Sequence, residues 1–309
     1  MQFILRFWHI LHAYKIYFTI TENGFQYFLP LLFIRLYAGH MRQKIVLITG
    51  GSSGIGRSIG VYLQSRGYKV YGTTRNLKNY PEFNDFRLIE LDVRDTSSIE
   101  QAIHSLIASE GFIDVLINNA GIGITGPIEE TPEAEIKKVF DTNFNGPINL
   151  IRAVLPLMRK QKSGLIINIT SIAGYMGLPY RGIYSASKGA LEILTEALRM
   201  ETKDFGVKIT NLAPGDFATN IAAGRYHAPA VDTSPYYKSY SKSLAIIDEH
   251  VNEGEDPVKV AEMVLKIINT KNPKVHYKVG SPMQKFSLVL KKILPDKVYE
   301  RLLLNHYKL

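Results

Sequence analysis

The chain of 309 residues contains no cysteine. Without a thiol, the protein cannot form disulfides, use a cysteine nucleophile or bind a metal through thiolates. The absence also fits a reducing compartment, and we expect a cytoplasmic location. The eight histidines are scattered, and the closest pair, His9 and His12, has no carboxylate nearby. We therefore expect no metal site.

Long uncharged apolar runs are also missing, since none approaches the ~18–20 residues that a transmembrane helix requires. Residues 1–40 are rich in aromatic and aliphatic side chains, but Lys15, Glu22 and Arg35 interrupt them. They contain no clear signal-peptide cleavage pattern. Two interpretations stay open: an apolar extension that associates with a membrane or a partner, or sequence upstream of the true start, because Met41 opens directly onto a strand-like run.

The main body lacks a basic face, although the formal net charge of the chain is +9. Residues 271–309 hold nine Lys/Arg against two Asp/Glu, and residues 1–40 hold three against one. Residues 41–270 balance at 25 each. The positive charge therefore lies at the two ends, so nucleic acid is not an expected partner. Peripheral contact with a membrane through these ends stays open.

What the sequence does contain, from residue 44 onward, is an alternation of short apolar runs and amphipathic helical patterns. Strands are expected at 44–49, 69–74, 86–93, 113–121, 164–171, 207–215 and 275–279. Helices are expected between them, among others over 97–110, 183–203 and 257–269. This alternation predicts an α/β fold with a doubly wound parallel sheet of the Rossmann type and helices on both faces.

The alternation weakens after Gly215. Residues 216–250 are rich in small residues, proline and tyrosine, and such a long irregular stretch is usually a functional lid or a disordered segment. Residues 281–309 have the pattern of two basic amphipathic helices split at Pro295. We therefore divide the chain into the 1–40 extension, a single main domain over 41–280 with a lid near 216–250, and a C-terminal helical extension over 281–309.

The first expected strand ends in the glycine-rich turn T-G-G-S-S-G-I-G, residues 49–56. Glycines let a backbone approach a pyrophosphate, and the N-terminus of the following helix stabilises its negative charge. The turn therefore predicts a dinucleotide site, although a tight turn that binds nothing is the alternative. The candidate contacts are Gly50, Ser52, Ser53, Gly54, Ile55 and Gly56.

Tyr184 and Lys188 stand one helical turn apart, so their side chains share one face of a helix. Taken alone, this spacing is common and describes two polar residues on a solvated face. The chemical alternative is proton transfer. An unperturbed tyrosine titrates near pH ~10, and a neighbouring ammonium favours the phenolate and lowers that pKa.

Taken together and in order, these motifs resemble the short-chain dehydrogenase/reductase family. The matching elements are T-G-x-x-x-G-I-G at 49–56, N-N-A-G at 118–121, Asn143 in "DTNFNG", Ser171, Y-x-x-x-K at 184–188 and "PGDFAT" at 214–219. The resemblance covers about residues 44–280, and residues 171–192 are similar to the hydroxysteroid and retinol dehydrogenase branch. It implies that 41–280 is the catalytic domain of an NAD(P)-dependent oxidoreductase that acts on CH–OH groups.

The resemblance implies four catalytic residues, Asn143, Ser171, Tyr184 and Lys188. Tyr184 would be the general acid in carbonyl reduction and the base in alcohol oxidation. Lys188 would lower the pKa of Tyr184 and hold the cofactor's ribose. Ser171 would hydrogen-bond the substrate oxygen. Asn143 would interrupt a helix and support a water chain that carries protons to Lys188.

The second expected strand ends in Thr74, where NAD-preferring members of the family place an aspartate. Without that carboxylate nothing repels a 2′-phosphate, and Arg75 could bind one through paired hydrogen bonds. NADP(H) is therefore the expected cofactor and NAD(H) the less favoured one, with a solvent-exposed loop arginine as the alternative for Arg75. The resemblance further implies cofactor contacts from Asp92, Val93, Asn119, Phe217 and Thr219, besides Tyr184 and Lys188.

The hydroxysteroid-like segment implies a bulky apolar alcohol or carbonyl as substrate, with Ser171, Tyr175, Met176 and Leu178 around it. A 3-oxoacyl reductase or a general carbonyl reductase is the alternative within the family. From another class, the alternative is a non-catalytic NADP-binding or membrane-associated interaction protein. Members of the family commonly form dimers or tetramers, so a homodimer or homotetramer is expected.

Overall fold

The computed structural model describes residues 42–217, 224–252 and 254–309. The interpretations of residues 1–40 and the cofactor contact expected from Thr219 therefore lie outside the described residues. Residues 218–223 of the expected lid also lie outside the described residues.

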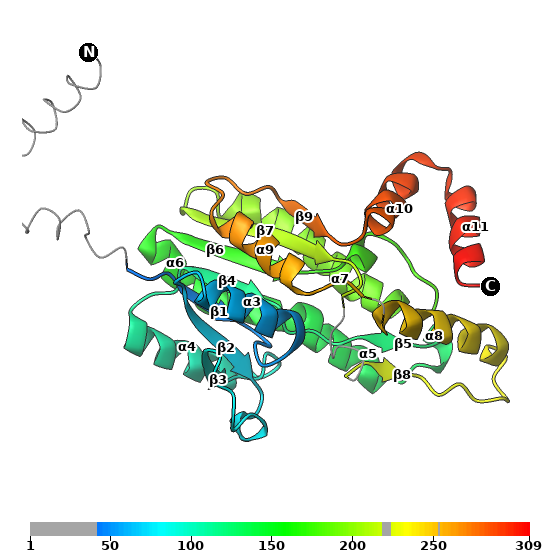
Figure 1. Ribbon diagram of the computed structural model, residues 1–309, viewed down its shortest axis with the longest axis horizontal. Coiled ribbons are helices and arrows are strands. Elements are labelled where there is room, and N and C mark those ends of the chain that lie inside the picture. The colour runs from blue at the N-terminus through cyan, green and yellow to red at the C-terminus, as the bar shows by residue number, and fades with distance from the viewer. Residues whose placement is uncertain (1–41, 218–223, 253) are drawn as a thin grey trace, which may run out of the picture. The chain divides into compact units, whose positions relative to one another are not determined.

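The central sheet has seven parallel strands in the order β3-β2-β1-β4-β6-β7-β9 (Figure 1). Their bounds are β1 Ile45–Ile48, β2 Lys69–Thr74, β3 Arg87–Glu90, β4 Val115–Asn118, β6 Gly164–Ile169, β7 Val207–Pro214 and β9 His276–Val279. The chain runs outward from β1 to β3 and then returns to β4, so the strand order reverses between β1 and β4. Ligands bind at the carboxyl ends of the strands at such a reversal.

Helices cover both faces of the sheet. They are α3 (Gly54–Gln64) and α9 (Val258–Ile268) on one face, and α4 (Thr96–Glu110) and α6 (Gly146–Gln161) on the other. Because successive strand residues point to opposite faces, Val46 and Ile48 pack with α3 and α9, whereas Ile45 and Leu47 pack with α4 and α6. Burial on both faces explains the apolar runs of the strands. The predicted doubly wound parallel sheet is confirmed.

The stretch between β4 and β6 is helical but interrupted. Helix α5 (Glu133–Phe140) passes through a π-helical turn (Asp141–Asn145) into α6. Asn143 lies in this turn, so the expected interruption of the helix is present. After β6, a short 3₁₀ turn (Ile172–Tyr175) leads to α7 (Gly182–Glu201), which carries Tyr184 and Lys188 near its start. Two further 3₁₀ turns span Leu77–Asn79 and Ile128–Glu130.

Two elements were not predicted from the sequence. β5 (Ile124–Thr125) pairs in parallel with β8 (Tyr226–His227), and α8 (Tyr237–Asn252) is helical where the pattern suggested an irregular stretch. Tertiary contacts explain the helix, since Tyr240 is buried and its hydroxyl donates to the carbonyl oxygen of Thr125 at 3.2 Å. Packing of this kind stabilises a helix whose sequence is weakly periodic.

The chain ends in two helices, α10 (Pro282–Ile293) and α11 (Asp296–His306), divided at Pro295. Ser281 and Gln284 form a capping box at the start of α10, each side chain bonding the backbone of the other residue. Within the described part of the chain, no helix is both long and apolar enough to cross a membrane.

Candidate active site

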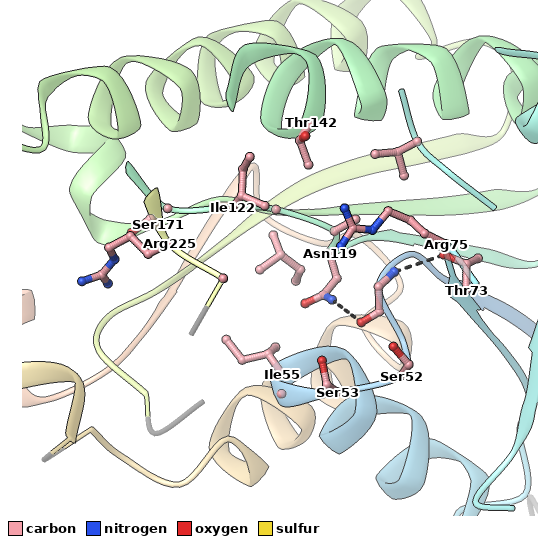
Figure 2. A pocket seen from close by; sticks show the side chains of 18 of the residues that line it. Ser52, Ser53, Ile55, Thr73, Arg75, Asn119, Ile122, Thr142, Ser171 and Arg225 are labelled. Atoms are coloured by element: carbon pink, nitrogen blue, oxygen red, sulfur yellow. Dashed lines mark hydrogen bonds between the residues drawn. The ribbon is translucent and has the colours of Figure 1, made fainter. Parts of the chain in front are cut away.

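A cavity of about 370 Å³ opens at the carboxyl ends of β1 and β4, where the strand order reverses. Its lining includes most of the residues predicted from the sequence: Gly50, Ser52, Ser53, Gly54, Ile55, Arg75, Asp92, Val93, Asn119, Ser171, Tyr184, Lys188 and Phe217. Figure 2 shows Arg75 at one end of the cavity and Ser171 at the other. We call these the cofactor end (the turn after β1, with Arg75 and Asp92) and the substrate end (Ser171, Tyr184 and their neighbours).

The glycine-rich turn has the geometry that a bound pyrophosphate requires. Gly50 and Gly54 adopt positive φ angles of 64° and 54°, which favour glycine. The amide of Gly50 donates to Thr73 Oγ1 at 3.2 Å, and Asn119 Nδ2 donates to the carbonyl oxygen of Gly50 at 3.1 Å (Figure 2). A methyl group on Gly56 would lie 2.2 Å from the Gly50 carbonyl oxygen, so only glycine lets α3 pack this closely.

The N-terminus of α3 adds a second feature that suits a phosphate. Ser53 is the N-cap residue, and its side chain makes no capping hydrogen bond. The first residues of the helix line the cavity next to Ser52. Backbone amides at a helix N-terminus carry a partial positive charge, so this end of the cavity fits the diphosphate of a dinucleotide.

The outer part of the cofactor end is rich in positive charge. Arg75, Arg94 and Lys138 line it, together with one carboxylate, Asp92. Arg94 donates to both carboxylate oxygens of Asp92, at 3.1 and 2.7 Å. This guanidinium holds the pKa of the Asp92 carboxyl below its usual value. The sequence analysis did not predict that Arg94 lines the cavity. Its position two residues after Asp92, a predicted cofactor contact, could have indicated it.

Lys188 is almost completely buried, with 5% of its surface exposed. Its Nζ donates to the carbonyl oxygen of Ile169 at 2.9 Å. Burial lowers the pKa of Lys188 from 10.5 to about 8, and the Glu192 carboxylate one turn further along α7 opposes part of that shift. A buried amine with a pKa near neutral pH is a common feature of catalytic sites.

Asn143 does not line the cavity but lies directly behind it. Its Oδ1 accepts from the amide of Ile122 at 2.8 Å, and its Nδ2 donates to the Ile122 carbonyl at 2.9 Å. Nδ2 also donates to Ser187 Oγ at 3.1 Å. A methyl group on Gly121 would be 3.2 Å from both Asn143 Oδ1 and Lys188 Nζ, so these two atoms converge on the same glycine.

Tyr184 and Ser171 face the cavity from two different elements. Tyr184 comes from the first turn of α7, and Ser171 follows β6 as the cap of the 3₁₀ turn, where its Oγ accepts from the amide of Ala173 at 3.1 Å. The Ser171 hydroxyl remains able to donate toward the cavity. The structure therefore brings Ser171, Tyr184 and Lys188 to one end of the cavity, with Asn143 behind them.

Glu192 is a buried carboxylate that the sequence reasoning missed. It lies one turn after Lys188 and is 4% exposed. Its oxygens accept from Thr170 Oγ1, from the Tyr175 hydroxyl at 2.7 Å and from Asn211 Nδ2 at 2.8 Å, and His276 Nδ1 lies 2.6 Å away. Burial and the Glu192 charge raise the pKa of Tyr175. The i, i+4 spacing from Lys188 was the available indication.

A row of buried asparagines continues this network across the sheet. Asn118, Asn168 and Asn211 are register partners on β4, β6 and β7. Asn118 Nδ2 donates to Asn168 Oδ1 at 2.8 Å, and Thr195 Oγ1 of α7 links Asn168 to Asn211 through bonds of 2.8 and 2.7 Å. A buried polar network of this size fixes α7, and with it Lys188, against the sheet.

Three of the predicted substrate residues do not line the cavity in the described structure. Met176 and Leu178 belong to an apolar cluster with Leu288 and Tyr299 of the C-terminal helices. Tyr175 is partly buried at the same cluster, and its hydroxyl is occupied by Glu192 and His276. Only Ser171 of the four predicted substrate residues therefore faces the cavity, because the 3₁₀ turn directs its successors toward the C-terminal helices.

The substrate end contains three charged side chains that were not predicted. Arg181, Asp216 and Arg225 line it, together with the apolar Ile122, Ile124 and Phe217. The guanidinium carbon of Arg181 lies 5.5 Å from the centre of the Tyr184 ring. Tyr307, near the end of the chain, is buried and lies close enough to Arg181 and to the Asp216 carboxylate for both charges to act on its pKa. Arg181 could have been predicted, because it precedes Tyr184 by three residues. No motif in the sequence indicated that Arg225 would line the cavity.

The described residues contain no group of three His, Asp or Glu side chains that could hold a metal ion. The cavity instead combines a dinucleotide cradle with a polar hydrogen-bonding set. The model of the short chain dehydrogenase family matches residues 44–229. The chain belongs to the short-chain dehydrogenase family. It is therefore an oxidoreductase that acts on CH–OH and carbonyl groups of small molecules.

Characterised relatives and solved structures agree with this assignment. The 3-ketodihydrosphingosine reductase of Bacteroides thetaiotaomicron is 41% identical over 261 residues, which covers 84% of this chain and 96% of that protein. The 17-beta-hydroxysteroid dehydrogenase type 1 of Homo sapiens is 32% identical over 256 residues and covers 77% of each chain. The resemblance to the hydroxysteroid branch is thereby confirmed.

A short-chain dehydrogenase from Streptomyces avermitilis has the same fold, with a TM-score of 0.71 and 32% identity over 86% of this chain and 97% of that one. Among other structural neighbours, one is in complex with NAD and another has NADP bound. Structural neighbours of this short-chain dehydrogenase thus bind either NAD or NADP.

Proposed function

We propose that this short-chain dehydrogenase is an NADP(H)-dependent carbonyl reductase for a long, apolar keto compound, with Asn143, Ser171, Tyr184 and Lys188 as its catalytic set. The observation that carries the proposal is the convergence of Ser171, Tyr184 and the buried Lys188 at one end of a cavity whose other end is a dinucleotide cradle. A non-catalytic binding protein has no need for that convergence.

Each catalytic side chain has one task in carbonyl reduction. Ser171 Oγ donates to the carbonyl oxygen and fixes its position. A nicotinamide held in the cradle would supply the hydride for the carbonyl carbon. Tyr184 transfers its phenolic proton to the carbonyl oxygen, which completes the alcohol. Lys188, as an ammonium below pH about 8, stabilises the phenolate form of Tyr184 that results. Asn143 holds the Ile122 backbone behind this site.

The charge at the cofactor end supports NADP(H) over NAD(H). Arg75, Arg94 and Lys138 line this end with one carboxylate, Asp92. Arg94 is bound to Asp92 at 2.7 Å and Lys138 to Glu135 at 3.1 Å, so Arg75 is the cation on which the assignment rests. Thr74 closes β2 where a carboxylate would repel a 2′-phosphate. A guanidinium gives a phosphate two charge-assisted hydrogen bonds, whereas a ribose hydroxyl gains little from it.

The substrate end supports a compound with both an apolar chain and a polar head. Ile122, Ile124 and Phe217 offer apolar contacts, and Arg181 and Asp216 offer charged ones. The relative that is 41% identical is named for 3-ketodihydrosphingosine, a long-chain ketone with an amino group next to the carbonyl and a hydroxyl group one carbon further. We infer a substrate of this class, in which Asp216 would face the ammonium.

A 3-oxoacyl substrate is the second candidate, because Arg181 and Arg225 both line the substrate end. Two guanidiniums favour an anionic group on the substrate, such as the phosphates of a thioester carrier, whereas the long-chain amino ketone is cationic. The two candidates thus differ in charge: the amino ketone has an ammonium beside its keto group, and the 3-oxoacyl thioester is neutral there.

Assembly is a separate part of the proposal. A homodimer or homotetramer is expected, as in other members of the family. The mass in solution, measured by light scattering, tests this expectation, and a monomeric mass at assay concentrations would contradict it.

The direct test measures oxidation of NADPH and NADH with a panel that holds a long-chain 3-keto amine, a 3-oxoacyl thioester, a steroid ketone and a short aldehyde. We expect the long-chain 3-keto amine to give the highest kcat/KM, with NADPH preferred. Tyr184→Phe should lower kcat by about 10²–10⁴-fold, since it removes the general acid. Wild-type activity in that variant would exclude the mechanism.

Arg75→Asp tests the cofactor assignment in the same assay. Loss of a charge-assisted contact of about 1.5–3 kcal/mol should shift the NADPH/NADH preference toward NADH by about 10–100-fold. Arg152→Asp, an exposed position on α6, is the control for a change of net charge. An unchanged preference in Arg75→Asp would overturn the assignment to NADP(H).

A further inference from the structure

Exposed large apolar side chains are far denser in the C-terminal helices than in the rest of the described chain. Of the seventeen large apolar side chains that are exposed there, eight lie in residues 283–309. They are Met283, Phe286, Val289, Ile293, Val298, Leu302, Leu304 and Leu309. Single exposed apolar residues are ordinary, but a cluster of this size marks a surface that is covered when the protein works.

On α10 these side chains form one stripe. Met283, Phe286, Val289 and Ile293 follow one another at spacings of three, three and four, so they share one face of the helix. The opposite face carries Leu288, which is 5% exposed and packs with Ile172 of the main body. Helix α10 is therefore apolar on two sides, and only one of them is buried.

The same two helices are strongly basic. Lys285, Lys291, Lys292, Lys297, Arg301 and Lys308 are all exposed, against Asp296 and Glu300. Figure 1 shows α10 and α11 beside one another at the end of the chain, apart from the helices that cover the two faces of the sheet. We call this surface, with its eight apolar and six basic side chains, the C-terminal face.

We propose that the C-terminal face docks this enzyme on a bilayer surface that contains anionic phospholipid. Apolar side chains on a basic helix lie at the boundary between head groups and acyl chains, while the lysines contact the phosphates. A second copy of the chain suits the face less well, because a two-fold contact would bring two sets of six cations together. Charge complementarity therefore selects the anionic membrane.

The C-terminal face is joined directly to the substrate end of the cavity. Gln284 of α10 donates to the carboxylate of Asp216 at 2.7 Å, and Asp216 lines the cavity. Tyr307, beyond α11, lies close to Arg181, which lines the same end. The helices that would meet the membrane thus contact two charged side chains that line the substrate end. This inference rests on the proposed function, because an apolar long-chain substrate is held in the bilayer and would enter from it.

Vesicle sedimentation of the full chain with NADPH tests the docking. Vesicles of phosphatidylcholine with an equimolar share of phosphatidylglycerol should sediment the protein, and vesicles of phosphatidylcholine alone should bind at least about tenfold less. The double variant Phe286→Glu/Ile293→Glu should lower binding to the anionic vesicles by about tenfold or more. Met200→Glu, equally exposed but on α7, should bind as the wild type does.

Each other outcome overturns the proposal. If the double variant binds anionic vesicles as well as the wild type, another segment makes the contact. If the wild type does not bind, while light scattering shows that the double variant splits an oligomer, the C-terminal face is an interface between copies. Turnover of the long-chain 3-keto amine in detergent, without vesicles, should be equal in all forms. Its absence in the wild type would refute the proposed function, whatever the vesicles show.

Discussion

The two ends of the cavity are assembled in different ways. The cofactor end comes from short local pieces, each at the carboxyl end of a neighbouring strand: the turn after β1, the end of β2 and the residues after β3 and β4. The residues of the substrate end come from separate segments, namely Ile122, Arg181, Asp216 and Arg225. Tyr307, near the end of the chain, lies close to Arg181 and Asp216 there. We expect a single substitution in a local turn to disturb the whole turn and to weaken binding strongly. A substitution of one of several separate contacts should remove that contact alone.

Outside the catalytic side chains, that contrast predicts large effects on ligand affinity at the cofactor end and small ones at the substrate end. The largest should come from Gly56→Ala, because the added methyl would lie 2.2 Å from the Gly50 carbonyl oxygen. The turn or α3 has to shift, which costs several kcal/mol, since ordinary overpacking already costs about 1–3 kcal/mol. We expect NADPH affinity, measured by fluorescence titration, to fall by about 100-fold or more.

Gly177→Ala is the matched control, because no atom lies within 4 Å of the methyl it would add. It should bind NADPH as tightly as the wild type does. Equal affinity in Gly56→Ala would mean that the turn is loose, and the contrast between the two ends would then be lost.

The cofactor end was also the part that could be predicted from the sequence. Gly50 and Gly54 act through the shape of the backbone, and the Asn119 side chain bonds that backbone. All three follow strands that the apolar pattern of the sequence already predicts. Tyr175 shows why the other end resists prediction. Its place in the segment that resembles the hydroxysteroid branch suggested a substrate contact, but its hydroxyl bonds a carboxylate seventeen residues further along and a histidine on β9. Such contacts depend on packing between distant segments, which no local pattern records.

Lys188, at the substrate end, is a residue at which function and stability oppose each other. Its pKa is about 8 in the folded, cofactor-free protein because of burial, against 10.5 for an exposed lysine. Below pH 8 the folded chain carries the full cost of a buried ammonium. As the pH rises from about 8 to about 10.5, the folded chain gives up its proton before the unfolded chain does, so the free energy of unfolding increases.

Lys188→Met removes this titration and keeps most of the side chain's volume. We expect the variant to be more stable than the wild type at pH 7 by up to roughly 3 kcal/mol, with the difference vanishing near pH 10.5. Urea unfolding at both pH values measures it. Turnover should be lost, since the ammonium that stabilises the Tyr184 phenolate is gone. A variant less stable than the wild type at pH 7 would show that burial costs the lysine little.

Glu192 tests how far the substrate end depends on groups behind it. Its carboxylate raises the pKa of Lys188, so Glu192→Gln should lower that pKa further. The alkaline limb of the pH profile of kcat reports loss of the Lys188 proton. This limb should move to lower pH by about one unit or less, and one unit corresponds to about 1.4 kcal/mol of interaction between the two groups. Glu196→Gln, one turn along and exposed, should leave the limb in place. A shift in both variants, or in neither, would deny Glu192 this role.

The smallest effect is expected where the end of the chain meets the substrate. Burial raises the pKa of Tyr307, and the charge of Arg181 opposes that shift. Tyr307→Phe removes the hydroxyl beside Arg181 but keeps the packing. A polar contact of this kind is worth about 1 kcal/mol, which predicts a rise in substrate KM of about fivefold. NADPH affinity should not change, because Arg181 and Asp216, the charged neighbours of Tyr307, belong to the substrate end. Tyr237→Phe, an exposed position on α8, is the control. If Tyr307→Phe weakens NADPH binding instead, the two ends are coupled through Arg181 and the contrast between them fails.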